Sequence, residues 1–203
     1  MNGSTTGKIR SQIPTHDKAL FNMEKNDNKK TLISFVNFVH LSEEELRIVH
    51  YWRNLDYIRK WMDNSDPISI EEHLAFCSSL KTREDKKYFM IFVDNCPCGV
   101  YDLTIIDYKS ATAEVGIYII NEFSHYSSAI SLMVNGIINH LGIKKLLANV
   151  KKDNERALVY NIIKLKAHIL GEDEKKVYIY YDYFPFDPDK DLVFKKYDCN
   201  IKF

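Results

Sequence analysis

Two short stretches of the sequence carry side chains that can transfer protons. The segment Glu114–Tyr118 has the composition of a strand, in which side chains alternate, so Glu114, Gly116 and Tyr118 share one face. A glycine inside a strand often marks a bulge or a close approach of the backbone. The carboxylate of Glu114 is therefore a candidate general base, although a solvent-facing glutamate beside a packing glycine fits the same pattern.

A tyrosine lies on a helix predicted later in the chain. Tyr160 follows Asn154 by six residues, and Asn154 is a suitable N-cap for the helix predicted between them. A phenol with its ordinary pKa near 10 can donate a proton. The apolar neighbours of Tyr160 are also typical of a tyrosine packed in a core, so both interpretations stay open.

A third stretch is suited to holding an anion. The segment Ser124–Ala129 precedes a predicted amphipathic helix. The first N–H groups of a helix lack intrahelical partners and carry partial positive charge, which suits a phosphate group. The residues placed to donate are Tyr126, Ser127, Ser128, Ala129 and Ile130.

The cysteines give no comparable signal. Cys96-Pro97-Cys98 has the spacing C-x-C, and no second Cys or His pair lies nearby. Structural zinc sites usually combine two such pairs with wider spacing. We therefore expect free thiols in a reducing cytoplasm and no metal.

Local patterns predict the elements that position these residues. Strands are predicted at Thr31–Val39, Lys87–Asp94, Cys98–Ile106, Ala111–Ile120, Lys145–Val150, Lys166–Leu170 and Val177–Phe184. Helices are predicted from capping boxes at Ser42 and Ser69, and over Tyr57–Met62, Ile130–Leu141 and Asn154–Leu165. Pro185 and Pro188 are expected to end the regular structure. This order predicts an α/β (α+β) protein built around one mixed sheet.

Composition limits the range of partners. The 203 residues contain 28 Lys plus Arg and 28 Asp plus Glu, so the net charge is zero. Without a basic surface, there is no electrostatic reason to expect nucleic acid or a membrane as partner. We expect a cytoplasmic monomer or homodimer with a flexible extension (1–30), one domain (31–184) and a C-terminal tail (185–203).

Five motifs in order indicate a family. They are Trp52-Arg53-Asn54, Ile70-Glu71-Glu72-His73-Leu74, Lys87-Tyr88-Phe89, Glu114-Val115-Gly116-Ile117-Tyr118 and Asp153-Asn154-x-x-Ala157-Leu158-x-Tyr160. Together they closely resemble the GNAT-type N-acetyltransferases of pseudaminic acid biosynthesis over about residues 32–184. Those enzymes acetylate the 4-amine of UDP-4-amino-4,6-dideoxy-N-acetyl-β-L-altrosamine, a precursor of the sugar on flagellin. The ribosomal-protein N-terminal acetyltransferases are wider relatives with most of the same motifs.

The resemblance implies a fold and an acetyl-CoA site. The GNAT fold has a mixed, mostly antiparallel sheet of about seven strands with about four helices, and its strands 4 and 5 splay apart. In the family, the pantetheine arm enters that gap beside Ile117 and Tyr118, where a free backbone N–H polarises the acetyl carbonyl. Tyr160 is then the general acid for the thiolate, and Asn154 contacts CoA.

Two departures from the family pattern bear on catalysis. The stretch Ser124–Ala129 lacks the glycines and the preceding Arg or Gln that usually hold the CoA pyrophosphate. Any position there with a positive φ would be strained without glycine. Asn149 stands where some relatives carry an acidic residue. The general base therefore stays open, with Glu114 and His73 as candidates acting directly or through water.

The acceptor side also follows from the resemblance. In the sugar-nucleotide enzymes the positions matching Arg53, Met62, His73 and Tyr118 line the acceptor pocket. Arg53 suits a diphosphate because its planar fork makes paired hydrogen bonds, and Met62 suits the face of uracil. Ordinary packing roles fit Arg53, Met62 and His73 as well.

Three functions remain to be separated. The first is acetyl transfer to a UDP-linked amino-dideoxy sugar, with acetyl-CoA as co-substrate and no metal. The second is acetylation of a protein N-terminus by the same fold, which requires an open groove in place of a closed pocket. The third is a binding domain that has lost catalysis, which the glycine-poor loop favours.

Overall fold

The computed structural model of the chain describes residues 30–182 and 184–203. The extension predicted for residues 1–30 therefore lies outside the described residues, apart from Lys30. Residues 31–203 cluster as one structural unit. Within the described part of this unit, no helix is both long and apolar enough to cross a bilayer.

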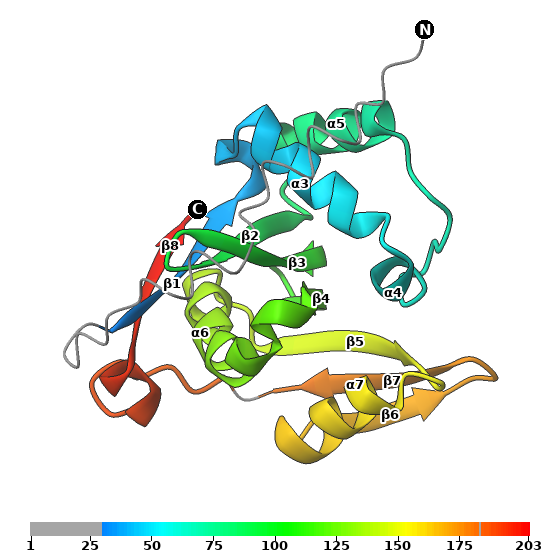
Figure 1. Cartoon of the computed structure of the whole chain (residues 1–203). Helices are drawn as coiled ribbons and strands as arrows, with labels where there is room; N and C mark the ends of the chain where they lie inside the picture. The colour runs from blue at the N-terminus through cyan, green and yellow to red at the C-terminus, as the bar shows by residue number, and fades with distance from the viewer. Residues whose placement is uncertain (1–29, 183) are drawn as a thin grey trace, which may run out of the picture. The chain divides into compact units, whose positions relative to one another are not determined.

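One eight-stranded mixed sheet forms the centre of this unit (Figure 1). The spatial order of the strands is β6-β7-β5-β4-β3-β2-β1-β8. Their bounds are β1 (Thr31–Asn37), β2 (Lys87–Val93), β3 (Cys96–Asp107), β4 (Thr112–Ile119), β5 (Lys145–Lys151), β6 (His168–Glu172), β7 (Lys176–Tyr181) and β8 (Tyr197–Lys202). The β1–β8 and β4–β5 pairs are parallel and the other five are antiparallel. The predicted fold class is confirmed, with one strand more than expected.

The helices are α3 (Glu43–Arg53), α4 (Asp56–Arg59), α5 (Ile70–Ser79), α6 (Ser127–His140) and α7 (Glu155–Val159). Helices α3 and α5 begin at the predicted capping boxes, α4 and α7 begin within one residue of the prediction, and α6 begins three residues before the predicted Ile130. Both predicted capping boxes form, with Ser42 and Ser69 accepting from the backbone three residues on while Glu45 and Glu72 bond back. Gly142 adopts φ 69° just after α6, as its place after the last helical turn predicts.

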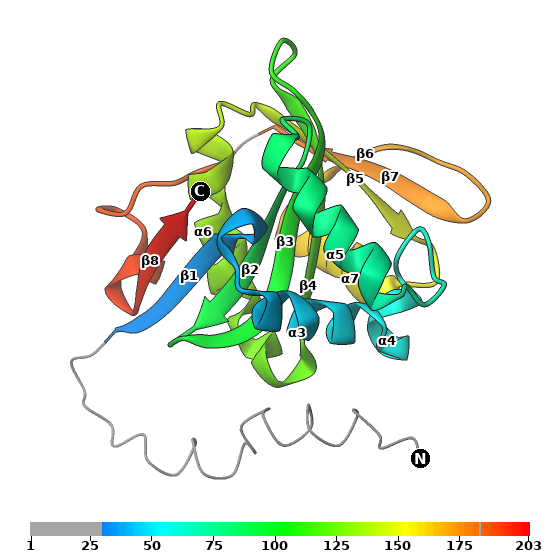
Figure 2. The same cartoon turned by 90° about the horizontal axis from the view of Figure 1, so that it is seen from above.

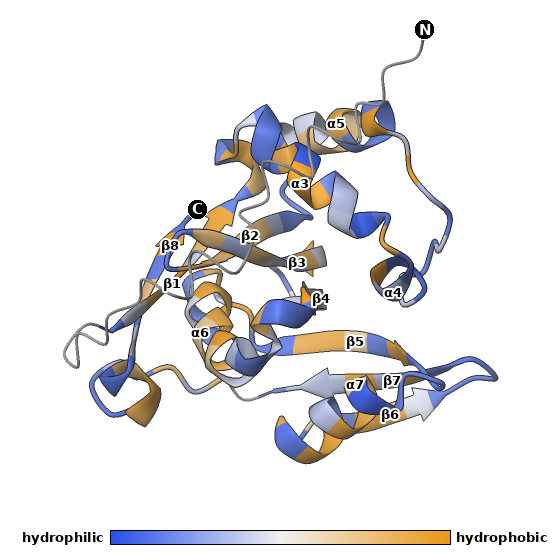
Figure 3. Ribbon diagram, in the orientation of Figure 1, coloured by the Kyte–Doolittle hydropathy of each residue, from blue (hydrophilic) through white to orange (hydrophobic). Residues whose placement is uncertain are grey.

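The helices cover both faces of the sheet. Helices α3, α4 and α5 pack on one face through a core that includes Trp52, Ile58 and Cys77 (Figure 2). Helix α6 packs on the other face through Ile130, Met133 and Ile137, and α7 packs on the same face beside β5 and β7. Hydrophobic residues concentrate in the strands and in α6, whereas the β6–β7 connection is hydrophilic (Figure 3).

The C-terminal segment belongs to the sheet. Regular structure was expected to end at Pro185 and Pro188, and this expectation is wrong, because residues 185–203 contain η5 (Leu192–Lys195) and β8. Strand β8 pairs with β1 from Thr31↔Tyr197 to Val36↔Lys202. Its side chains alternate between half-buried and exposed, which is the period-2 pattern of an edge strand. This segment therefore extends the sheet beyond β1.

Candidate active site

Strands β4 and β5 separate halfway along their length. They pair only from Thr112↔Lys145 to Glu114↔Leu147, although β4 continues to Ile119 and β5 to Lys151. Beyond Glu114, β4 has no ladder partner on its β5 side among the described residues, so backbone N–H and C=O groups on that side are available to a ligand. The splay expected between strands 4 and 5 is confirmed. Ile117 and Tyr118, the expected neighbours of the pantetheine arm, both lie in this unpaired part of β4.

The backbone before α6 needs no glycine. A 3-10 helix, η3 (Asn121–Tyr126), leads directly into α6, and no residue from 121 to 130 has a positive φ. The strain foreseen for a glycine-poor loop is therefore absent. The Ser127 hydroxyl and its backbone N–H both donate to the carbonyl of Ser124. One of the predicted pyrophosphate donors is thus already engaged, and the donors that remain come from the rest of the first turn.

Tyr160 lies beneath the first turn of α6. Its hydroxyl donates to the Ser127 carbonyl at 3.2 Å and lies 2.8 Å from the Ser131 hydroxyl. Tyr160 opens a π-helical turn, η4 (Tyr160–Lys164), that continues α7, and such turns occur often at functional sites. The structure thus brings the predicted acid to the helix predicted to hold the CoA pyrophosphate. Its phenol is held by oxygen atoms rather than by packing alone.

Asn154 caps α7, as predicted. Its side-chain oxygen accepts from the backbone N–H of Ala157 at 3.2 Å. This cap fixes the start of the helix whose continuation carries Tyr160. A role of Asn154 in contacting CoA stays a prediction.

Glu114 and Asn149 face each other across the mouth of the gap. The amide of Asn149 on β5 donates to the Glu114 carboxylate on β4 at 2.7 Å. One oxygen of the candidate base is therefore occupied by a neutral donor.

Two buried polar groups on the α3–α5 face have no partner among the described residues. Arg53, the last residue of α3, donates from Nη2 to the Asn64 carbonyl, but its Nη1 is buried and unpaired. The Tyr118 hydroxyl is buried and unpaired as well. Burial raises the pKa of Tyr118 well above its usual value, with Asp102 adding to the rise and Arg53 opposing it. Unsatisfied buried groups of this kind are uncommon in native proteins and often mark a ligand site.

His73 and Met62 lie within the helical layer. His73 on α5 is buried, lies 3.0 Å from the Leu46 carbonyl through Nε2, and lies beside Cys77 and the ring of His50. Burial first, then His50, lowers the pKa of His73 to about 4. Its partners belong to α3 and α5, so this geometry favours a packing role over the predicted base. Met62 packs against the same core.

Sequence reasoning missed Asp102. This aspartate lies in the middle of β3 between buried Tyr101 and Leu103. A lone carboxylate inside an otherwise apolar strand is an available signal, because charged residues are rarely buried without a partner. Asp102 pairs in register with Gly116, so it faces the same side as Glu114 and Tyr118.

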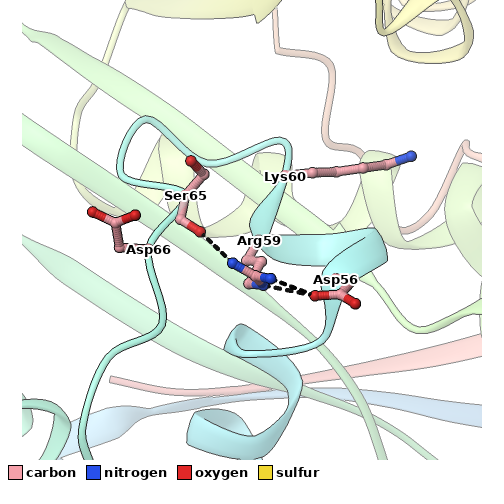
Figure 4. A pocket seen from close by; sticks show the side chains of 5 residues that line it. All are labelled: Asp56, Arg59, Lys60, Ser65 and Asp66. Carbon is pink, nitrogen blue, oxygen red and sulfur yellow. Dashed lines mark hydrogen bonds and ion pairs between the residues drawn. The ribbon is translucent and has the colours of Figure 1, made fainter.

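A surface hollow beside α4 lies apart from these residues. It is lined by Asp56, Arg59, Lys60, Ser65 and Asp66 (Figure 4). Arg59 there already bonds to the Asp56 carboxylate and to the Ser65 carbonyl. None of its lining residues was predicted to bind substrate. Among residues 30–182 and 184–203, no three His, Cys, Asp or Glu side chains gather as metal ligands.

Comparisons with known proteins agree with this geometry. No protein-family model matches the chain. The chain is 32% identical over 154 residues to the acetyltransferase PseH of Campylobacter jejuni serotype O:2, covering 73% of this chain and 92% of that protein. The crystal structure of the C. jejuni N-acetyltransferase PseH in complex with acetyl coenzyme A is 30% identical, with TM-score 0.57 over 74% of this chain and 98% of that one. FdhC, a nucleotide-linked sugar GNAT, matches in fold alone, at 19% identity and TM-score 0.61 over 75% of this chain and 86% of that one.

Proposed function

The chain belongs to the family of the PseH acetyltransferases, and from this premise we propose that it acetylates the 4-amino group of a UDP-linked amino-dideoxy sugar. It is an acetyl-CoA-dependent N-acetyltransferase with the GNAT fold. The acceptor places it in pseudaminic acid biosynthesis, which supplies the sugar of glycosylated flagellin. The similarity to PseH along nearly the whole length of that protein is the observation that carries this proposal.

The donor side uses the α6 face of the sheet. The acetyl-pantetheine arm lies along the unpaired part of β4, where a free N–H polarises the thioester carbonyl. The pyrophosphate lies at the N-terminus of α6, whose free N–H groups favour an anion. The Tyr160 hydroxyl, held at the Ser127 carbonyl, protonates the thiolate of CoA.

The acceptor side uses the α3–α5 face. The unpaired Nη1 of Arg53 binds the diphosphate of the acceptor, and Met62 lies against the uracil. These contacts are remote from the reacting amine. Their binding energy orients the amine toward the thioester, and orientation of this kind lowers the barrier by several kcal/mol.

An acceptor comparison tests this function. Purified protein is assayed with acetyl-CoA and one of three acceptors: a UDP-linked 4-amino-4,6-dideoxy sugar, the free amino sugar, or Ser- and Ala-initiated peptides. Release of the CoA thiol is measured in every case. We expect turnover of the UDP-sugar and much poorer turnover of the free sugar. Turnover of peptides with none of the UDP-sugar would identify an N-terminal acetyltransferase instead.

Variants of Arg53 test whether the diphosphate of the UDP-sugar is what the protein recognises. Arg53→Ala should lower kcat/KM for the UDP-sugar about tenfold or more, because a hydrogen bond to a charged group contributes about 1.5–3 kcal/mol. The free sugar, which has no diphosphate, should be affected far less. Arg53→Lys should recover part of the loss. Arg47→Ala is the matched control, since Arg47 lies on the same helix with its ion pair to Glu43 in solvent. Equal losses for both sugars would contradict diphosphate binding by Arg53.

A further inference from the structure

Asp102 on β3 is the direct neighbour of Gly116 on β4, the strand that borders the gap to β5. Its register partners are Tyr88 on β2 and Gly116 on β4. A Cβ atom placed on Gly116 would come 2.5 Å from an Asp102 carboxylate oxygen. A larger residue at this position would therefore displace the carboxylate, so the glycine in the strand marks a close approach of a side chain. Gly116 is two residues past Glu114, the last residue of β4 that pairs with β5.

The Asp102 carboxylate has no hydrogen-bond donor or ion-pair partner among the residues that the structure describes. Its pKa is raised to about 7, first by burial and then by the charge of Glu114, while Lys86 acts in the opposite direction. A half-buried carboxylate without donors is costly to the folded state. Ionisable groups whose pKa is strongly shifted are frequently those that bind or react with a substrate.

Two further unpaired groups share this environment. Tyr118, two residues beyond Gly116, is affected electrostatically by both Asp102 and Arg53. The Tyr118 hydroxyl and the Arg53 Nη1 are buried without partners within the described residues. This face therefore carries a carboxyl group, a hydroxyl group and a guanidinium without partners among the described residues. An amine and a phosphate are the ligand groups whose chemistry complements the carboxylate and the guanidinium.

We propose, on the basis of the acetyl transfer proposed above, that Asp102 binds the amino group of the acceptor and removes its proton before acetyl transfer. The acceptor enters as an ammonium ion and gives one proton to the Asp102 carboxylate, which later returns it to solvent. The amine lone pair then attacks the thioester carbonyl carbon, forming the C–N bond as the C–S bond breaks. Tyr160 protonates the thiolate, and the second proton lost from nitrogen restores Tyr160 through solvent. Amide, CoA thiol and one released proton are the products.

Asp102 fits this role better than Glu114 on the observed contacts. Glu114 already accepts the Asn149 amide at 2.7 Å, whereas Asp102 retains its full capacity to accept hydrogen bonds. The charge of Glu114 also keeps Asp102 basic. Glu114 thus acts as a positioning residue whose influence reaches the amine through Asp102.

The inference predicts a specific pH dependence. The charges that act on Asp102 are those of Lys86, just before β2, and Glu114 on β4. The groups that Asp102 acts on in turn are Tyr88 on β2, Tyr101 on β3 and Tyr118 on β4, and Arg53 on α3 acts on Tyr118. Asp102 is active as the carboxylate, so kcat/KM for the amine should rise with pH through the neutral range. A variant without this carboxylate should lose that limb of the profile.

Asp102→Asn in the full-length chain tests the inference. The amide has nearly the same shape as the carboxyl group, so the space beside Gly116 stays filled. We expect kcat/KM for the amine to fall about 10²-fold or more, the range of general base catalysis, with the affinity for acetyl-CoA unchanged by calorimetry. Asp102→Ala should regain part of its activity when formate is added. Glu71→Gln, which neutralises an exposed carboxylate on α5, should retain wild-type activity.

The outcomes separate this inference from the proposed acceptor. Asp102→Asn is assayed with whichever amine the wild-type protein acetylates. Loss of activity toward a peptide, with no turnover of the UDP-sugar, would keep Asp102 as the base and overturn the sugar as acceptor. Wild-type kcat/KM and an unchanged pH profile in Asp102→Asn, or a larger loss in Glu114→Gln, would overturn the role of Asp102 alone. Absence of turnover with every amine would overturn both.

Discussion

The two faces of the sheet meet the gap between β4 and β5 with polar groups in different states. On the α6 face, the hydroxyls of Tyr160 and Ser131 and the carbonyl of Ser127 bond to one another. On the α3–α5 face, the Tyr118 hydroxyl and the Arg53 Nη1 have no partners within the described residues. The Tyr160, Ser131 and Ser127 groups are thus bonded before any ligand binds, although the Tyr101 hydroxyl in the core of the same face is buried without a partner within the described residues as well.

This difference follows from what each face has to recognise. Acetyl-CoA is bound mainly through backbone groups, which any sequence with the right strand and helix provides. An acceptor is distinguished by side chains, and side chains that wait for a ligand leave buried polar groups unsatisfied. We therefore expect changes on the α6 face to affect acetyl transfer with any amine. Changes on the α3–α5 face should depend on the acceptor.

Tyr160→Phe should give the largest effect on the α6 face. Removing the phenolic proton should lower kcat about 10²-fold, the low end for general acid catalysis, whichever amine is used. The KM for acetyl-CoA should change little, because the ring remains in place. Steady-state kinetics with both sugars measures the effect.

A matched tyrosine controls for the loss of a hydrogen bond. Tyr181 donates to Asn161 at 2.5 Å beside the same helical segment, so Tyr181→Phe removes a similar bond away from the gap. It should keep wild-type kcat. Equal kcat values for Tyr160→Phe and Tyr181→Phe would assign Tyr160 to packing. The α6 face would then contribute no proton donor to acetyl transfer.

The cost of an unpaired carboxylate should be visible as a pH-dependent stability. The folded-state pKa of Asp102, about 7, lies above its ordinary value of 3.8, so the folded protein holds this proton more tightly than the unfolded chain. The associated stability is fully present below pH 3.8 and is lost as the pH rises to about 7. One pKa unit corresponds to 1.36 kcal/mol, and with partial exposure of the residue we expect an effect on the order of 2 kcal/mol.

Asp102→Asn removes that titration. Its melting temperature relative to wild type should therefore be several degrees higher at pH 8 than at pH 4. Thermal unfolding of both proteins across this range gives the measurement, with Glu71→Gln as the exposed carboxylate control. A difference in melting temperature that is the same at both pH values would show that the carboxylate is not strained in the folded state.

The sequence predicted the elements well because their signals are local. The capping boxes at Ser42 and Ser69 and the apolar spacing within α6 each lie within a few turns of chain. Strand β8 was missed because two prolines outweighed the alternation of Tyr197–Lys202. This segment becomes a strand because it pairs with β1, which is far away in the sequence.

The site was predicted only in part, since its decisive contacts join distant residues. Tyr160 was named as the candidate acid, a role that stays a prediction, and its partner Ser131 lies 29 positions earlier. The importance of Asp102 depends on the β3–β4 register, which places it over Gly116. The expected strain near Ser127 did not occur, because a 3-10 helix reaches α6 with ordinary backbone angles. No local pattern contains this information.

The smallest predicted effect concerns the start of α6. Ser127→Asp adds a carboxylate at the first residue of the helix, where a negative charge favours the helix itself, so the fold should be retained. The same charge would repel the pyrophosphate proposed to bind there. Affinity for acetyl-CoA should weaken by about 1 kcal/mol, roughly fivefold, and the loss should shrink at high salt because exposed charges are screened. Ser127→Asn, nearly the same in shape but neutral, should bind acetyl-CoA as the wild type does. Equal affinities of the Asp and Asn variants by calorimetry would place the pyrophosphate elsewhere and would remove the α6 face from the comparison.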